Sequence, residues 1–183
     1  MLVNLGYKAA LVETDTNYTL NTLRRMEVFK SKAKDNSLFQ IMGSSDERII
    51  EDLEALRKED LDFIIVDSAG KTTDGNIKKL CIESDLIIVP TSLTQNDLLV
   101  TYQTIEDIKP AMGINKNLKI LVLPNRIHSA TRVATVKAAL EQLQAEMIES
   151  FVPMKNVFAG FSTILPEKEY LNTAKEILQH LEN

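Results

Sequence analysis

A ten-residue stretch decides the fold class of this 183-residue chain: LDFIIVDSAG, residues 61–70. Its middle is an almost unbroken apolar run, which is the pattern of a strand buried on both faces of a parallel sheet. The run stops at Asp67, and small and polar residues follow. In an open α/β sheet the chemistry lies at the carboxyl ends of the strands. We therefore expect an α/β protein with Asp67 at a functional edge.

Similar apolar runs alternate with helical patterns on both sides of this stretch. We expect further strands over Lys8–Val12, Leu38–Met42, Leu86–Val89 and Leu118–Leu123. Helices are expected over Asn17–Lys32, Ser45–Lys58, Asn76–Glu83, Asn96–Ile108, Ala130–Glu149 and Glu167–Leu181. In the second of these, Ser44 or Ser45 is expected to cap an apolar stripe of Ile49, Ile50, Leu53 and Leu56. The alternation predicts one three-layer αβα domain over residues 1–183, with a mainly parallel sheet.

The bulk composition excludes several classes of protein. The formal net charge is −5, and 44% of the residues are hydrophobic and 26% charged, which is an ordinary globular balance rather than that of a disordered chain. The longest apolar runs have about five residues, whereas a membrane helix needs about twenty. A single cysteine, Cys81, allows no internal disulfide and reads as a small buried hydrophobe. We expect a cytoplasmic protein that does not associate with membranes.

Basic residues are concentrated in one part of the sequence. The segment Ile108–Leu140 contains no acid, but it contains six bases: Lys109, Lys116, Lys119, Arg126, Arg132 and Lys137. This pattern fits two interpretations, an ordinary solvated face and a local surface for an anionic ligand or nucleic acid.

Polar residues follow four of the expected strands, and together they outline a crevice for a phosphorylated ligand and Mg²⁺. They are Glu13-Thr14-Asp15, Asp67-Ser68, Pro90-Thr91-Ser92 and Pro124-Asn125-Arg126. Asp67 has the form of a Walker B acid, which orders Mg²⁺ beside phosphates. The alternative is an aspartate that caps the following turn.

A partial phosphate-loop motif, Gly70-Lys71-Thr72, follows Asp67. A complete loop requires a glycine five positions before the glycine of G-K-T, and that position is Ile65, inside the expected strand. Without that glycine the loop cannot wrap phosphates with its backbone N–H groups. We therefore do not interpret this segment as a phosphate loop.

The order of these motifs resembles the ParA/MinD family of deviant-Walker ATPases, and ParA-type partition proteins most closely. The resemblance runs along the whole chain and includes the D-x-D-like Glu13-Thr14-Asp15 and the strand that ends in Asp67. Other matching segments are Leu5-Gly6-Tyr7-Lys8, Cys81 through Thr91, Asp97-Leu98, Leu121 through Arg126, Phe158-Ala159-Gly160 and Ala174-Lys175-Glu176. The resemblance implies a P-loop NTPase-like fold.

The resemblance also implies roles for individual residues. Asp15 matches the acid that helps to position the attacking water and the metal shell, and Asp67 matches the Walker B acid that orders Mg²⁺ through water. Asn125 and Arg126 match the adenine-contacting pair, and Pro90 matches a strand-end proline near the nucleotide. A DNA surface is implied around Arg132, Lys137 and Lys155.

Two departures from the family pattern affect the predicted chemistry. Glu13 replaces the first aspartate of D-x-D, and Thr16-Asn17 replace Pro-Gln. The family's first strand and its deviant Walker A loop have no counterpart in this sequence, and the resemblance would place them about 25 residues before Met1. That strand is expected between the Asp67 and Leu86 strands, so its absence would leave unpaired buried backbone groups that cost about 1–3 kcal/mol each.

Two explanations account for the missing segment: Met1 is an internal residue of a longer protein, or the chain is a degenerate paralogue that closes the gap in another way. The residues Leu2, Val3 and Leu5 resemble the end of a helix already under way, which favours the first explanation.

Three functions remain open from the sequence. The first is a partition ATPase that dimerises with ATP and Mg²⁺, binds DNA nonspecifically and responds to a ParB-like partner, but is inactive in hydrolysis as printed. The second is a non-catalytic ParA-like protein for dimerisation or partner docking. The third is a receiver-like domain with Asp67 as phospho-acceptor and Lys109-Pro110 as its Lys-Pro pair, although that pair ends a helical pattern rather than a strand.

Overall fold

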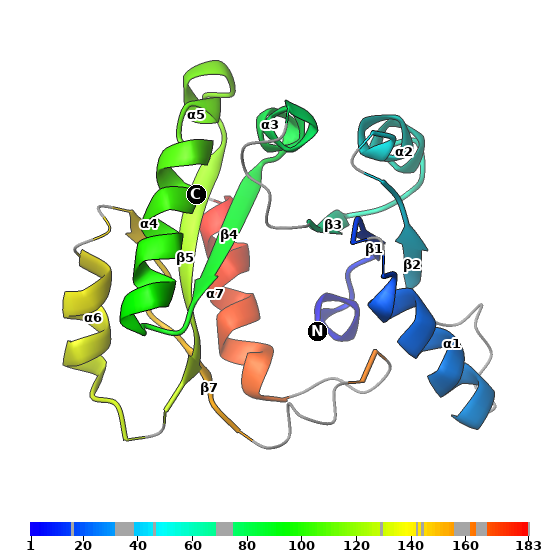
Figure 1. Ribbon diagram of the computed structural model, residues 1–183. Coiled ribbons are helices and arrows are strands. Elements are labelled where there is room, and N and C mark those ends of the chain that lie inside the picture. Colours follow the sequence, from blue (N-terminus) through cyan, green and yellow to red (C-terminus); the bar gives the residue numbers. More distant parts are fainter. Residues whose placement is uncertain are drawn as a thin grey trace. The chain divides into compact units, whose positions relative to one another are not determined.

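The computed structural model confirms an α/β protein in which all strand pairs are parallel (Figure 1). It describes the chain except for residues 16, 32–38, 46, 69–74, 129, 142, 144, 156–161, 164–167 and 183. For residues 31, 133 and 169 only the backbone is described. The Gly70-Lys71-Thr72 and Phe158-Ala159-Gly160 motifs therefore lie outside the described residues.

The chain divides into two compact units. Unit 1 comprises Met1–Leu80 and Phe161–Glu167, and unit 2 comprises Cys81–Gly160 and Lys168–Asn183. Each unit contains parallel strands flanked by helices, so the predicted three-layer architecture is confirmed. The expectation of one domain over residues 1–183 stays a prediction.

Unit 1 is built on a three-stranded sheet in the order β2-β1-β3. Its elements are η1 (Leu2–Leu5), β1 (Ala9–Glu13), α1 (Thr19–Ser31), β2 (Gln40–Gly43), α2 (Ile49–Leu56) and β3 (Phe63–Asp67). The central strand β1 is the most deeply buried, and Ala10 and Val12 have no exposed surface. Gly6 ends η1 in the left-handed conformation, with φ of 95°, which glycine adopts without steric cost.

Unit 2 is built around β5 (Lys119–Ile127), which pairs with three other strands. Unit 2 begins inside α3 (Gly75–Glu83), at Cys81. Its other elements are β4 (Leu86–Thr91), α4 (Gln95–Ile108), α5 (Ala111–Ile114), α6 (Val133–Glu141), β6 (Glu146–Met147), β7 (Val152–Pro153), η4 (Lys168–Tyr170) and α7 (Leu171–Glu182). Cys81, in α3, is 7% exposed, and burial raises the pKa of its thiol, which confirms the prediction of a buried hydrophobe.

Strands β3 and β4 differ from the prediction of strands buried on both faces. Among the described residues, β3 pairs only with β1 and β4 pairs only with β5, so each lies at the edge of its sheet. Ile65 in β3 is 44% exposed and Ile88 in β4 is 37% exposed. The apolar pattern therefore predicted the strands correctly but not their burial, because sheet position depends on pairing.

Two helix predictions were wrong. The expected helix over Ala130–Glu149 is instead α6 followed by strand β6, in which Met147 pairs with Val122 of β5. Residues 146–147 pair with β5 as a strand, although the apolar spacing of this segment continues that of the helix. The expected caps Ser44 and Ser45 do not cap α2, which starts later, after Arg48, and has no side-chain cap.

Each unit contains a polar clamp that fixes a segment from the end of the chain. In unit 1, the buried Arg24 donates from Nε to Thr163 Oγ1 at 2.8 Å and from Nη1 to the Phe39 carbonyl at 2.8 Å. Glu27 accepts from Thr163 N at 2.8 Å. Partial burial would raise the pKa of Glu27, but its hydrogen bonds with Ser162 and Thr163 lower it. In unit 2, the Glu176 carboxylate accepts from Ser150 N at 2.8 Å, which anchors α7.

Candidate functional site

The carboxyl ends of the three strands of unit 1 are tied together by backbone hydrogen bonds. Glu13 and Asp67 are register partners in the pairing of β1 with β3. Beyond the strands, Thr14 N donates to the Asp67 carbonyl at 3.0 Å, and Ser44 N donates to the Glu13 carbonyl at 2.9 Å. The sequence prediction that Asp67 and the Glu13–Asp15 segment share one edge is therefore confirmed within this unit.

The Glu13 side chain is buried and serves the structure of α1. It is 1% exposed, and its carboxylate accepts from Leu20 N at 2.9 Å and from Asn21 N at 3.2 Å. These N–H groups belong to the first turn of α1, where a helix has unsatisfied donors and a partial positive charge. The position that resembles the first aspartate of D-x-D thus holds a carboxylate that caps a helix.

Asp15 and Asp67 keep their side chains toward solvent. Asp15 is exposed, and its Oδ1 accepts from Asn17 N at 3.0 Å in an Asx turn. Asp67 is also exposed, yet partial desolvation, followed by the nearby charges of Glu13 and Asp15, raises its pKa above the usual value. Negative charges close enough to raise the pKa of Asp67 form a region that attracts a cation.

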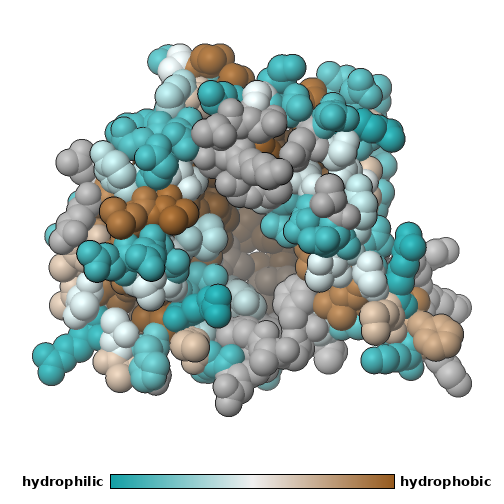
Figure 2. Space-filling view, viewed as in Figure 1, coloured by the Kyte–Doolittle hydropathy of each residue, from teal (hydrophilic) through white to brown (hydrophobic). Residues whose placement is uncertain are grey.

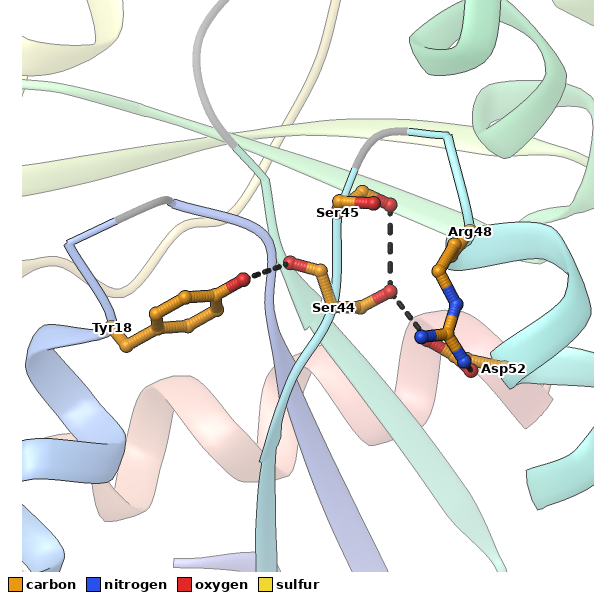
Figure 3. A network of polar contacts seen from close by, with 5 residues as sticks. All are labelled: Tyr18, Ser44, Ser45, Arg48 and Asp52. Atoms are coloured by element: carbon orange, nitrogen blue, oxygen red, sulfur yellow. Dashed lines mark hydrogen bonds and ion pairs between the residues drawn. The ribbon is translucent and has the colours of Figure 1, made fainter.

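A polar network fixes the loop that carries Asp15 to the end of β2 (Figure 3). The Tyr18 hydroxyl donates to the Ser44 carbonyl at 3.3 Å, and Ser44 Oγ lies 2.6 Å from Asp52 Oδ2. Arg48 forms an ion pair with Asp52 at 3.6 Å. The network therefore links the residue after β2 to both the Asp15 loop and helix α2.

The Tyr18 ring covers Gly43, and sequence reasoning missed both residues. A Cβ at Gly43 would lie 2.5 Å from Tyr18 Cδ1 and Cε1, a separation that side chains do not tolerate. Tyr18 itself has a φ of 45°, an uncommon conformation for a residue other than glycine. A glycine at the end of an expected strand was the available signal for this close approach.

In unit 2 the predicted nucleotide residues lie at the ends of two paired strands. Pro90 and Thr91 of β4 pair with Leu123 and Pro124 of β5. Strand β5 continues to Ile127, so Asn125 and Arg126 lie within it rather than after it as predicted. Asn125 is half-buried, whereas Arg126 is exposed and has a φ of 59°. Pro90 is exposed, and its missing N–H is tolerated because β4 is an edge strand.

The hydroxyls at the end of β4 and just after it differ in their hydrogen bonding. Ser92 Oγ donates to the carboxylate of Asp97, and Thr94 caps α4 by accepting from Asp97 N at 3.3 Å. Thr91 is 2% exposed, and its Oγ1 is the one buried side-chain polar atom in the described part of the chain that has no hydrogen-bond partner. Thr91 therefore has an uncompensated desolvation cost at this strand end.

The three residues predicted to contact DNA are all exposed in unit 2. Arg132 precedes α6, Lys137 lies in α6 and Lys155 follows β7. Lys137 forms an ion pair with Glu149 at 3.3 Å, so part of its charge is neutralised. Whether these side chains bind DNA stays a prediction.

The candidate metal site on Asp15 and Asp67 also stays a prediction. In the described ranges, no three His, Cys, Asp or Glu side chains are grouped so that they could hold a metal ion directly. The reason at this edge is that the Glu13 carboxylate faces the first turn of α1. Asp15 and Asp67 remain as acids that could hold Mg²⁺ through water, which is the binding mode that the resemblance implies.

Within the described residues, no helix is both long and apolar enough to span a bilayer.

Solved structures similar to this chain share its fold. A chain of the MinC:MinD cell division protein complex from Aquifex aeolicus superposes with a TM-score of 0.69 and 18% identity, covering 97% of this chain and 86% of that one. The MinD cell division protein from Aquifex aeolicus superposes with a TM-score of 0.65 and 16% identity, covering 97% of this chain and 86% of that one. A plasmid partition protein from Borrelia burgdorferi superposes with a TM-score of 0.64 and 16% identity, covering 98% of this chain and 88% of that one.

The sequence comparisons are more specific about the family. No curated protein sequence matches the chain. The profile of the VirC1 protein family, however, matches residues 1–170. This match spans both the acidic strand ends of unit 1 and the β4 and β5 strand ends of unit 2. Together with the structural similarities, it confirms the predicted resemblance, and the chain belongs to the ParA/MinD-like VirC1 family.

Proposed function

We propose that this chain acts as a ParA-like partition protein whose homodimer binds DNA nonspecifically under the control of ATP, Mg²⁺ and a ParB-like partner. The observation that supports this proposal most directly is the Asp15–Asp67 pair. Two exposed acids at neighbouring strand ends, with the pKa of Asp67 raised, form an anionic site suited to a hydrated divalent cation.

The family resemblance implies a separate role for the predicted residues of each unit. Asp67 and Asp15 would hold Mg²⁺ through water, and the bound ion would neutralise phosphate charge. Asn125 would recognise the base by its amide, with Arg126 and Pro90 beside the nucleotide. Arg132, Lys137 and Lys155 would supply the positive surface for DNA.

DNA binding gives the sharpest test of this proposal. We expect the 183-residue protein to bind a long DNA duplex with an affinity that falls steeply with salt concentration. Arg132→Gln combined with Lys137→Gln should weaken binding and flatten the salt dependence by about 0.9 per lost phosphate contact. Lys175→Gln, which alters an exposed base of unit 2 outside the basic segment Ile108–Leu140, is the matched control. Binding that is absent, or equally strong in all variants, would contradict the proposal.

Nucleotide binding distinguishes the proposed ATPase from its main alternative. The printed sequence contains no complete G-x-x-x-x-G-K-[ST] motif, so we expect these 183 residues to show neither tight Mg-ATP binding nor ATP hydrolysis. Calorimetric titration with Mg-ATP, with Asp67→Asn as control, tests this expectation. A tight complex would contradict it.

The second candidate function is a non-catalytic protein for dimerisation or partner docking. It is favoured by the capping role of Glu13, because the carboxylate at the first D-x-D position is occupied with α1. Self-association that is independent of nucleotide, measured by analytical ultracentrifugation, would support this candidate over the ATPase.

The structure does not favour a receiver-like function. Lys109 follows α4 as its C-cap and Pro110 precedes α5, so the Lys-Pro pair lies between two helices rather than after a strand.

A further inference from the structure

Helix α1 exposes two large apolar side chains. Phe29 is 88% exposed and Met26 is 51% exposed. They are three residues apart, so they lie on the same face of the helix. Figure 2 shows apolar and hydrophilic surface side by side over α1, at the lower right of the view.

The same face is positively charged. Arg25 lies four residues before Phe29, and Lys30 follows it directly. Both basic side chains are exposed. In the described part of the chain, neither has a hydrogen-bond or ion-pair partner. The acid of this helix, Glu27, is occupied with the hydroxyl and backbone N–H of Thr163. We call the four residues Arg25, Met26, Phe29 and Lys30 the α1 face.

Helix α4 lacks this combination of positive charge and apolar surface. Helix α4 also exposes large apolar residues, because Leu99 is 64% exposed and Val100 is 66% exposed. However, the charged residues of α4 are all acids: Asp97, Glu106 and Asp107. The net charge of the whole protein is −5, so an uncompensated basic face on it favours an anionic partner.

We propose that the α1 face binds single-stranded nucleic acid, with a base stacked on Phe29 and phosphates bound by Arg25 and Lys30. Single-strand binding sites combine aromatic side chains, on which bases stack, with cations that follow the backbone. Stacking needs an accessible ring, which Phe29 provides, and it needs no base-specific hydrogen bonds. This proposal does not depend on the duplex-binding residues of unit 2.

An anionic membrane is the less favourable partner for the same face. A single myristoyl chain gives only marginal membrane binding. Two side chains, one of them half-exposed, present less apolar surface than such a chain, and two cations do not make a polybasic cluster.

The test uses the full 183-residue protein and a fluorescent oligothymidylate of about 16 nucleotides, which is within the usual site size. We expect binding by anisotropy at low salt. Phe29→Ala should weaken it on the order of tenfold, as loss of one stacking interaction does. Phe29→Leu should bind as weakly as Phe29→Ala, because leucine has no ring, whereas Phe29→Tyr should bind as the wild type does. Leu99→Ala, which removes an apolar side chain that is 64% exposed from α4, is the control.

The electrostatic part of the proposal has its own measurement. In Arg25→Gln combined with Lys30→Gln, the dependence of log affinity on log salt should become shallower by about 0.7 per phosphate contact. Circular dichroism should show unchanged folding, because all of these side chains are exposed.

Three outcomes would overturn the proposal. They are no binding of the oligonucleotide by the wild-type protein, equal binding by Phe29→Leu and wild type, or Phe29-dependent binding to vesicles of phosphatidylglycerol and phosphatidylcholine without oligonucleotide binding. None of these bears on the proposed partition function, which is tested by Arg132 and Lys137 on duplex DNA.

Discussion

The carboxyl strand ends of the two units have opposite chemistry. In unit 1, β1 and β3 end in Glu13 and Asp67, with Asp15 shortly after, whereas the β4 and β5 ends of unit 2 carry Thr91, Asn125 and Arg126. The unit 1 loop is tied down by the Glu13 cap and by Tyr18 over Gly43, while unit 2 contains an unpartnered hydroxyl. At the carboxyl strand ends of unit 1, Glu13 and Tyr18 therefore support the fold, whereas at those of unit 2 the Thr91 hydroxyl has no such partner.

The largest expected effect comes from Glu13. In Glu13→Ala, two N–H groups of α1 lose their buried acceptor, so we expect the free energy of unfolding to fall by about 2–4 kcal/mol. Urea denaturation measures this change. Glu13→Gln keeps one amide oxygen as acceptor and should lose less, and Asp15→Ala, at an exposed position, should cost about 1 kcal/mol or less. Equal losses for Glu13→Ala and Asp15→Ala would mean that Glu13 is not a structural acid.

The second prediction concerns the close approach of Tyr18 to Gly43. Gly43→Ala places a Cβ against the Tyr18 ring and should cost about 1–3 kcal/mol, as overpacking does. In a Tyr18→Ala background the same change should cost little, because the clashing ring is gone. A double-mutant cycle by thermal or urea unfolding measures the difference. Additive effects would contradict the contact.

The third prediction compares two buried threonines of unit 2. Thr91→Val removes an unpartnered hydroxyl and should stabilise the protein by up to about 1 kcal/mol. Thr101 is also buried, but its Oγ1 donates to the Asp97 carbonyl at 2.7 Å. Thr101→Val should therefore destabilise by about 1 kcal/mol. Changes of the same sign in the two variants would show that Thr91 has a partner.

The smallest effect is the pH dependence caused by Asp67. Its pKa is raised in the folded state, so the folded chain binds the Asp67 proton more tightly than the unfolded chain does. The favourable contribution is present below the unfolded pKa, near 3.8, and is lost as pH rises through the folded pKa.

The measurement for this last prediction is urea unfolding of wild type and Asp67→Asn at several acidic pH values. The stability of Asp67→Asn relative to wild type should increase as pH rises above about 3.8. An Asp97→Asn variant in unit 2 is the control for a general effect of removing charge. A relative stability that falls with rising pH would reverse the sign and contradict the electrostatic crowding of Asp67.

The comparison also explains which site residues could be predicted. Asp67 and Asp15 were found because an acid that follows an apolar strand is visible in the sequence. Glu13 occurs in the same motif, but its carboxylate reaches N–H groups seven and eight residues later, and no local spacing rule predicts that contact. Tyr18 and Gly43 meet across 25 positions of sequence, so only the pairing of β1 with β2 brings them together.

The amino-acid sequence by itself determined the alternation of strands and helices, the parallel pairing and the polar strand ends, because period and β-branched composition are local properties. The family resemblance had already placed an absent strand between the Asp67 and Leu86 strands, whereas the exposure of Ile65 and Ile88 was visible only in the tertiary structure. The tertiary structure also decided that residues 146–147 join β5 as a strand instead of extending α6. Burial and pairing depend on neighbours distant in the sequence, and a local pattern carries no information about those neighbours.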